Sequence, residues 1–134
     1  MAEGQSSRLY GRSKGKTLRK EPRRLLHEAL PKYAIAREGA IDPTALFARA
    51  PSDIWMEIGF GGGEHLIGMA GAHPEIGFIG CEPFVNGTAK ILSLIEAGAH
   101  DNIRLYCGDA VELLGWLPDA SLARVDLLLS LIHI

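Results

Sequence analysis

The sequence predicts an α/β fold in which a parallel sheet is covered by helices on both faces. Short apolar runs alternate with segments of helical spacing, and turn or acidic residues follow most of the runs. The runs show no polar face, which is typical of strands buried between two layers of helices. The 134 residues are enough for one such domain with a single core.

Four strands and three intervening helices are predicted in the region that begins at Ile54. The strands are expected at residues 54–58, 77–81, 103–107 and 124–129. The helices are expected at residues 64–72, 85–97 and 111–117. Gly98 is expected to end the second helix, because a glycine readily adopts the left-handed conformation found there.

The chain is divided into three parts by composition. Residues 1–33 form a basic arm ending in a short helix that stops near Pro31, residues 34–53 form a connector, and residues 54–134 form the sheet domain. The arm has nine Lys and Arg against three Glu, a net charge of +6, so the remaining residues have a net charge of −8. This asymmetry indicates a polyanionic partner that the arm contacts.

Two further features limit the classes of function that we expect for the chain. No apolar run is long enough to span a membrane or to serve as a secretory signal, so we expect a cytoplasmic location and no membrane partner. The two cysteines, Cys81 and Cys107, do not form a CxxC pair, and both end apolar runs. We therefore expect small buried thiols rather than metal ligands.

Three acidic residues, Glu57, Glu82 and Asp109, stand at or just after the ends of the first three predicted strands. The carboxyl ends of strands in a doubly wound sheet meet where ligands bind, so the three carboxylates are expected to converge on one site. Glu82 can accept hydrogen bonds from two ribose hydroxyls, and Asp109 can accept one from an amine such as that of adenine. Glu57 can face the cationic end of a ligand, directly or through water.

A glycine-rich loop at residues 59–63 follows the first predicted strand. Its glycines, Gly59 and Gly61 among them, let the backbone approach a ligand closely and adopt positive φ. A nicotinamide dinucleotide site needs a sixth-position glycine, but Glu64 stands there and would oppose a pyrophosphate at the helix start. S-adenosylmethionine has no phosphate, so this position favours an S-adenosylmethionine-dependent methyltransferase over a dehydrogenase.

The chain resembles the bacterial tRNA (guanine-N7-)-methyltransferases in the segments EIGFGGGEHL, FIGCEPFVNGTAK and DNIRLYCGDAVELL. Its N-terminal LYGRSKGKTLRK is similar to the basic segment of that family, and EPFVNG is the most specific part of the match. The resemblance runs from about Leu9 to about Leu128. It implies a Rossmann-like class I methyltransferase that transfers a methyl group from S-adenosylmethionine to N7 of a guanine in the variable loop of tRNA.

The resemblance also implies roles for eight residues and no metal. The residues implied to bind S-adenosylmethionine are Glu57, Gly59, Gly61, Glu82 and Asp109. The residues implied to bind the tRNA backbone are Arg12, Lys14 and Lys16. Because N7 of guanine has an available lone pair, the reaction needs alignment of the two reactants rather than a general base.

The resemblance stops after the fourth predicted strand. The family continues there with a Pro-Asp-Pro-Trp-Pro-Lys type segment that supplies a catalytic-site carboxylate, whereas this chain continues with an apolar run to Ile134. No residue, His133 included, is therefore assigned as catalytic. We expect an incomplete family member whose residues 130–134 are not family sequence, and which is inactive and poorly soluble alone. Two alternatives stay open: methylation of another substrate, and a catalytically inactive fragment that binds cofactor or RNA.

Overall fold

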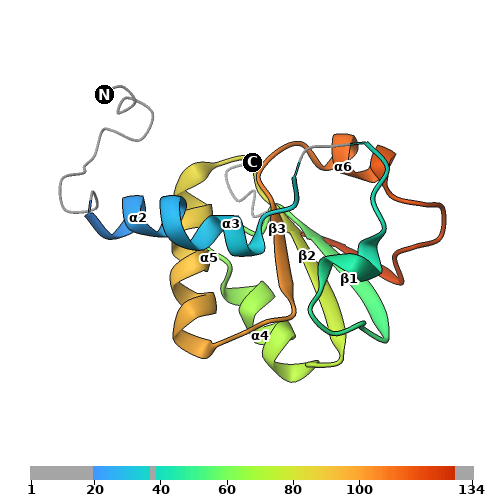
Figure 1. Cartoon of the computed structure of the whole chain (residues 1–134), viewed down its shortest axis with the longest axis horizontal. Coiled ribbons are helices and arrows are strands. Elements are labelled where there is room, and N and C mark those ends of the chain that lie inside the picture. The colour runs from blue at the N-terminus through green and yellow to red at the C-terminus, as the bar shows by residue number, and fades with distance from the viewer. Residues whose placement is uncertain (1–19, 37–38, 129–134) are drawn as a thin grey trace.

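The computed structural model describes residues 20–36 and 39–128, and these form one parallel sheet with helices around it (Figure 1). The strands are β1 Asp53–Ile58, β2 Ile76–Cys81, β3 Ile103–Tyr106 and β4 Arg124–Leu127. They lie in the order β3-β2-β1-β4, and every neighbouring pair is parallel. The predicted α/β class and parallel sheet are confirmed.

Three helices connect the strands, close to where the sequence predicts them. They are α4 Glu64–Ala72, α5 Val85–Gly98 and α6 Ala110–Trp116. Side chains of α4 and α5 pack in one core cluster, and those of α6 pack in a second. Residues 78 and 79 of β2 belong to different clusters, as expected for alternate side chains of a strand. The helices therefore cover both faces of the sheet, as predicted.

The segment before the sheet forms a continuous helical stretch that packs on the face with α5 (Figure 1). It consists of α2 Lys20–Arg24, a π-helical turn η2 Leu25–Ala29, and α3 Leu30–Tyr33. Leu25 and Ala29 are buried in the same core cluster as α4 and α5. The division of the chain at residues 33 and 53 stays a prediction, and residues 1–19 lie outside the described part.

The helical stretch ends at Tyr33, two residues after Pro31, which agrees with the predicted end near Pro31. The backbone N–H of Leu30 donates to Leu25, five residues back, and a new α-helical turn begins there. Pro31 lies in the first turn of α3, where a missing N–H costs little. The connector after α3 includes a short 3₁₀ turn, η3 Pro43–Leu46, whose Phe47 neighbour packs in the second core cluster.

Two expectations about burial are wrong. All six residues of β2 are buried, but Val125 and Leu127 of β4 are 48 % and 58 % exposed. Cys81 is buried, and burial raises the pKa of its thiol to about 12. Cys107 is exposed because β3 ends one residue earlier, at Tyr106.

Candidate functional site

The three predicted acidic residues lie at one edge of the sheet, at the carboxyl ends of neighbouring strands. Glu57 is near the end of β1, Glu82 directly follows β2, and Asp109 lies three residues after β3. The strand order reverses between β1 and β4, so this edge contains the topological switch point at which open α/β sheets bind ligands. The structure therefore places the three acids along one edge of the sheet.

The loop between β1 and α4 has the backbone conformation that its glycines allow. Gly59, Gly61 and Gly63 have φ angles of 77°, 59° and 90°, in the left-handed region that strains residues with a Cβ. Phe60 is buried in the core and anchors the loop, while Gly61 is exposed. The loop consequently presents backbone, without side-chain bulk, at the edge where the acids lie.

Glu82 is tied to this loop, although it comes 21 residues after it. The carboxylate is 6 % exposed, and its Oε1 accepts a hydrogen bond from the Gly61 N–H at 2.8 Å. Its Oε2 accepts a second bond from the Phe84 N–H at 3.2 Å. Each oxygen keeps one lone pair after these bonds. Glu82 therefore fixes the loop and can still accept hydrogen bonds from a ligand.

Gly87, in the first turn of α5, makes the close approach of loop and helix possible. A Cβ at this position would lie 2.2 Å from the carbonyl oxygen of Gly61. The neighbour is backbone, so it cannot turn away as a flexible side chain could. Nothing about Gly87 in the sequence reveals this contact, because the glycine is far from the loop along the chain.

Glu57 is the most unusual group of the site. It is 3 % exposed, and its Oε1 lies 2.8 Å from Nδ1 of His65 on α4. Within the described residues, its buried Oε2 has no hydrogen-bond partner. Burial raises the pKa of the Glu57 carboxyl above its ordinary value, and the charge of Asp126 on β4 adds to the rise. The bond to His65 opposes this rise.

Asp109 lies at the start of α6 and caps that helix. Its Oδ1 accepts a hydrogen bond from the Val111 N–H at 3.0 Å, and the residue is exposed. Capping occupies one oxygen and leaves the other, Oδ2, without a bond to the described residues. An acid directly before a short helix is a recognised sequence signal for this capping role.

Glu64 begins α4 and pairs with Lys90 of α5, beside Gly62 of the loop. The Lys90 ammonium holds the pKa of the Glu64 carboxyl below its usual range, so the carboxylate is ionised. A negative charge therefore lies at the start of α4, where it would oppose the pyrophosphate of a nicotinamide dinucleotide, as the sequence predicts. Lys90 offsets that charge in part, and this pairing was not predicted.

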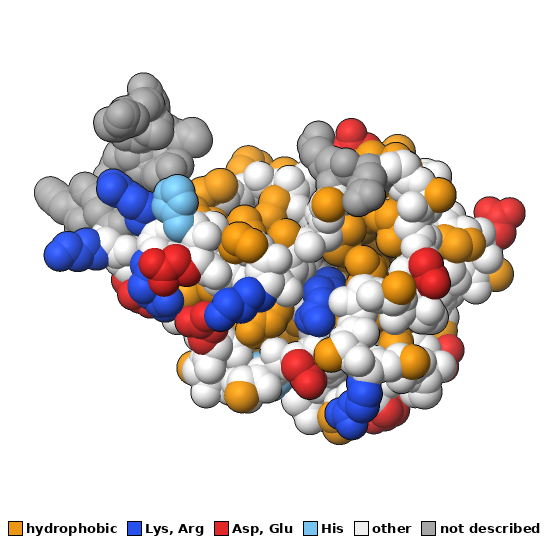
Figure 2. All heavy atoms as spheres, in the orientation of Figure 1, with side chains coloured by type: hydrophobic (Ala, Val, Ile, Leu, Met, Phe, Trp, Pro, Cys, Tyr) orange, Lys and Arg blue, Asp and Glu red, His pale blue; other side chains and the backbone are white. Residues whose placement is uncertain are grey.

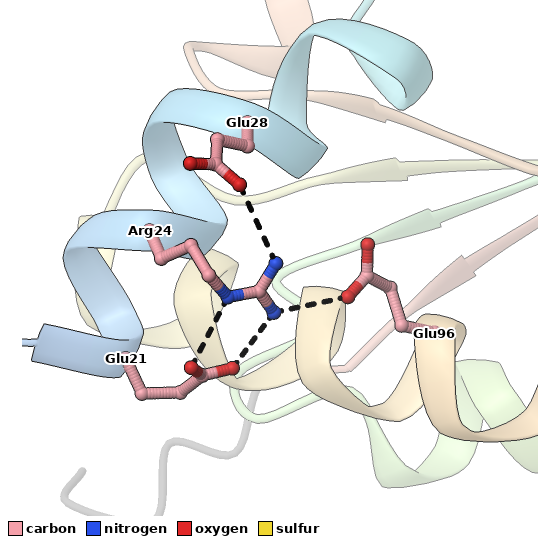
Figure 3. Close-up of polar contacts among 4 residues, drawn as sticks. All are labelled: Glu21, Arg24, Glu28 and Glu96. Carbon is pink, nitrogen blue, oxygen red and sulfur yellow. Dashed lines mark hydrogen bonds and ion pairs between the residues drawn. The ribbon is translucent and has the colours of Figure 1, made fainter.

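The predicted tRNA-contact residues Arg12, Lys14 and Lys16 lie outside the described residues. The part of the basic segment that the structure describes begins at Lys20. A hollow of about 380 Å³ lies along its helices α2 and η2, and it is lined by Lys20, Arg23, Arg24, His27 and Glu28. Basic side chains gather over these helices in Figure 2. Among them Arg24 is occupied: it bonds to Glu21 and Glu96 and lies 3.8 Å from Glu28 (Figure 3).

Two kinds of feature are absent from the described part of the chain. Residues 20–36 and 39–128 contain no group of three or more His, Cys, Asp and Glu placed to hold a metal ion. The helices within these ranges are all too short or too polar to cross a membrane.

The chain was compared with known proteins. A family model described as "Putative methyltransferase" matches residues 51–130. Proteins named tRNA (guanine-N(7)-)-methyltransferase are similar to 90 % or more of the chain. That of Nitrobacter hamburgensis is 54 % identical over 93 % of the chain, and that of Rhodopseudomonas palustris strain BisB18 is 56 % identical over 90 %. One from a Chelativorans species is 43 % identical over 93 % of the chain.

The chain spans about half the length of the curated relatives it matches, 49 % for the first two proteins and 55 % for the third. The family model covers more than half of this chain, including β1 to β4 and the whole glycine loop. The parallel α/β sheet agrees with that match. The chain therefore belongs to the methyltransferase family that this model describes.

Proposed function

We propose that the chain binds S-adenosylmethionine at the carboxyl edge of its sheet, as part of an enzyme that methylates N7 of a guanine in tRNA. The observation behind the proposal is Glu57: a buried carboxylate oxygen without a donor among the described residues, next to a loop of bare backbone. Leaving such an oxygen unpaired destabilises a fold, so it is kept where a ligand uses it.

The site residues suit the chemical groups of this cofactor. Glu57 would accept hydrogen bonds from the ammonium group, directly or through water, and the backbone of Gly59 and Gly61 would lie along the ligand. Glu82 has one free lone pair on each oxygen for the two ribose hydroxyls. Asp109 has Oδ2 for the amine of adenine. When bound, the cofactor supplies an electrophilic methyl group on a sulfonium.

The chain's own contribution to the reaction would be orientation and charge. N7 of guanine already has a nucleophilic lone pair, so the protein aligns it with the methyl group and excludes water. Methylation leaves a cationic purine, which the acidic edge of the sheet would stabilise. The substrate follows from the names of the relatives and from the basic segment, whose residues Arg12, Lys14 and Lys16 would bind phosphates.

Calorimetric titration with S-adenosylmethionine tests the cofactor. We expect the full chain to bind it, and Glu57→Gln and Asp109→Asn each to weaken binding about tenfold or more, the scale of one charge-assisted hydrogen bond. Asp101→Asn is the matched control, because it removes the same charge at the opposite end of β3. Equal affinities of Asp109→Asn and Asp101→Asn would contradict the assignment of Asp109.

Filter binding of a tRNA transcript at several salt concentrations tests the partner. Replacing Arg12, Lys14 and Lys16 together by Ala should weaken binding and reduce the slope of log K against log salt by about two to three, one unit or less for each phosphate contact. Arg49→Ala, at a hollow of about 430 Å³ on the opposite edge of the sheet, should leave the slope unchanged. An unchanged slope in the triple variant would exclude the arm as the phosphate-binding element.

Mapping of methylated tRNA tests the reaction itself. Methyl transfer to a position other than N7 of guanine would favour the other-substrate alternative. Binding of S-adenosylmethionine without any transfer would mean that this chain holds the cofactor and needs further sequence for catalysis.

A further inference from the structure

We propose that His65 is a positioning residue of the cofactor site: it holds Oε1 of Glu57 so that Oε2 is left to receive the ammonium group of the bound methyl donor. This inference rests on the proposed function. It assigns a role to a residue in the first turn of α4 that the loop, the acids and the family match do not mark.

The geometry of the pair supports this role. Nδ1 of His65 is 2.8 Å from Oε1 of Glu57, and the ring reaches the strand from the next element of the chain. The imidazole is 49 % exposed, whereas the carboxylate it contacts is 3 % exposed. His65 therefore stands between solvent and a buried acid: Nδ1 is bonded to the acid, and Nε2 has no partner among the described residues.

The two oxygens of Glu57 differ in a way that a purely structural pair would not require. Oε1 has the His65 donor, and Oε2 is buried with no donor among the described residues. An ionised carboxylate of this kind is normally satisfied on both oxygens. The bond to His65 fixes the rotamer of Glu57, because rotation of the carboxylate would break it. The unsatisfied oxygen consequently keeps one position.

The charges around Glu57 explain why a cationic group is the expected ligand. Asp126 lies opposite Glu57 in the register of β1 and β4, and its negative charge disfavours ionisation of Glu57. Burial acts in the same direction, and only His65 opposes it among the groups that influence Glu57. An ammonium group has three N–H donors and a positive charge. It would supply Oε2 of Glu57 with a hydrogen bond and offset the negative charges around it. A neutral donor would satisfy the hydrogen bond alone.

Calorimetric titration of the full chain with three ligands tests the inference. S-adenosylmethionine and S-adenosylhomocysteine both have the ammonium group, and 5′-methylthioadenosine shares the nucleoside but lacks it. We expect His65→Leu to weaken the first two about tenfold or more, the scale of one charge-assisted hydrogen bond. Its affinity for 5′-methylthioadenosine should stay within about twofold of the wild-type value.

His65→Asn is the conservative variant, because its side-chain amide places an N–H near the position of Nδ1. We expect it to restore most of the affinity for the two ligands with an ammonium group. A measurement on the wild-type chain avoids dependence on how the variants fold: the ¹⁵N resonances of the His65 ring should shift on adding S-adenosylhomocysteine and not on adding 5′-methylthioadenosine.

The outcomes separate the inference from the proposed function. Equal weakening of all three ligands in His65→Leu, or no weakening of any, would overturn the positioning role while leaving the cofactor assignment intact. An unshifted His65 ring would overturn it as well. If the wild-type chain bound none of the three ligands, the proposed function itself would be wrong, and the role of His65 with it.

Discussion

The ends of β1 and β2 have the same kind of residue in two different states. Glu82, after β2, accepts backbone hydrogen bonds on both oxygens and fixes the glycine loop. Glu57, near the end of β1, is equally buried but accepts only the bond from His65, within the described part of the chain. Both oxygens of Glu82 accept hydrogen bonds within the fold, whereas Oε2 of Glu57 is still able to accept one.

This difference shows that burial alone does not reveal whether both oxygens of an acid are hydrogen-bonded within the fold. Substitutions at the two strand ends should accordingly have opposite effects on the free energy of unfolding, although both are expected to weaken ligand binding. Four substitutions test this contrast.

The largest effect is expected at Gly87, which lets α5 lie against the loop that Glu82 holds. Gly87→Ala would put a Cβ 2.2 Å from the Gly61 carbonyl oxygen, so loop or helix must move. We expect a loss of at least about 3 kcal/mol in the free energy of unfolding, the upper range for overpacking. Urea denaturation measures it. Gly68→Ala, in α4 with open space around it, is the control and should gain up to about 1 kcal/mol.

The next largest effect is expected at Glu82. Glu82→Ala leaves the N–H groups of Gly61 and Phe84 without their acceptor, so we expect a loss of about 2 kcal/mol or more by urea denaturation. Glu75→Ala, an exposed acid before β2, is the matched control and should change stability little. If the two variants were equally stable, Glu82 would not be holding the loop.

Glu57→Gln should change stability in the opposite direction. The folded pKa of Glu57 lies above its ordinary value of 4.5, so the folded state binds this proton more tightly than the unfolded chain. The wild type then loses stability as pH rises through the interval from 4.5 to the raised pKa, and the variant does not. Urea denaturation at pH 4 and pH 8 should find the variant's advantage larger at pH 8. A larger advantage at pH 4 would mean that burial does not disfavour the ionised form.

The smallest effect is expected at Arg24, which lies far from both strand ends. Its three carboxylate partners are exposed or half-buried, and two of them, Glu21 and Glu96, hold the pKa of the guanidinium above its ordinary value (Figure 3). Arg24→Gln should lower stability only slightly, and added salt should remove the difference, because exposed ion pairs are screened. A salt-independent loss would indicate that packing of the Arg24 stem on α5 matters more than charge.

Much of the fold was predictable because its periodicity is local. Strands β1 to β3 and helices α4 to α6 lie within a few residues of their predicted ranges, since apolar runs and helical spacing are properties of short segments. The presence of the acids at one edge was also predictable. Parallel strands with helical crossovers place their carboxyl ends together whatever the details of packing.

The contacts between distant segments were not predictable. Neither the bond from Gly61 to Glu82 nor the bond from His65 to Glu57 has a signal in the sequence, because each depends on how two elements pack. The end of α5 is another case: Ala99, not Gly98, takes the left-handed conformation, with a φ of 53°. A Cβ at Gly98 would lie 2.5 Å from the His100 ring, which is a side chain that can turn away.

Helix α5 also sets the distance between the glycine loop and the helical segment at residues 20–33. Its first turn lies against the glycine loop at Gly87, and Glu96, near its other end, binds Arg24 of the helical segment at residues 20–33. These two residues are nine positions apart, which is about 14 Å along a helix axis. A helix of this size is a stiff spacer, so it keeps the basic segment and the loop at a constant separation. A group bound at one end of α5 therefore lies at a fixed distance from the other end.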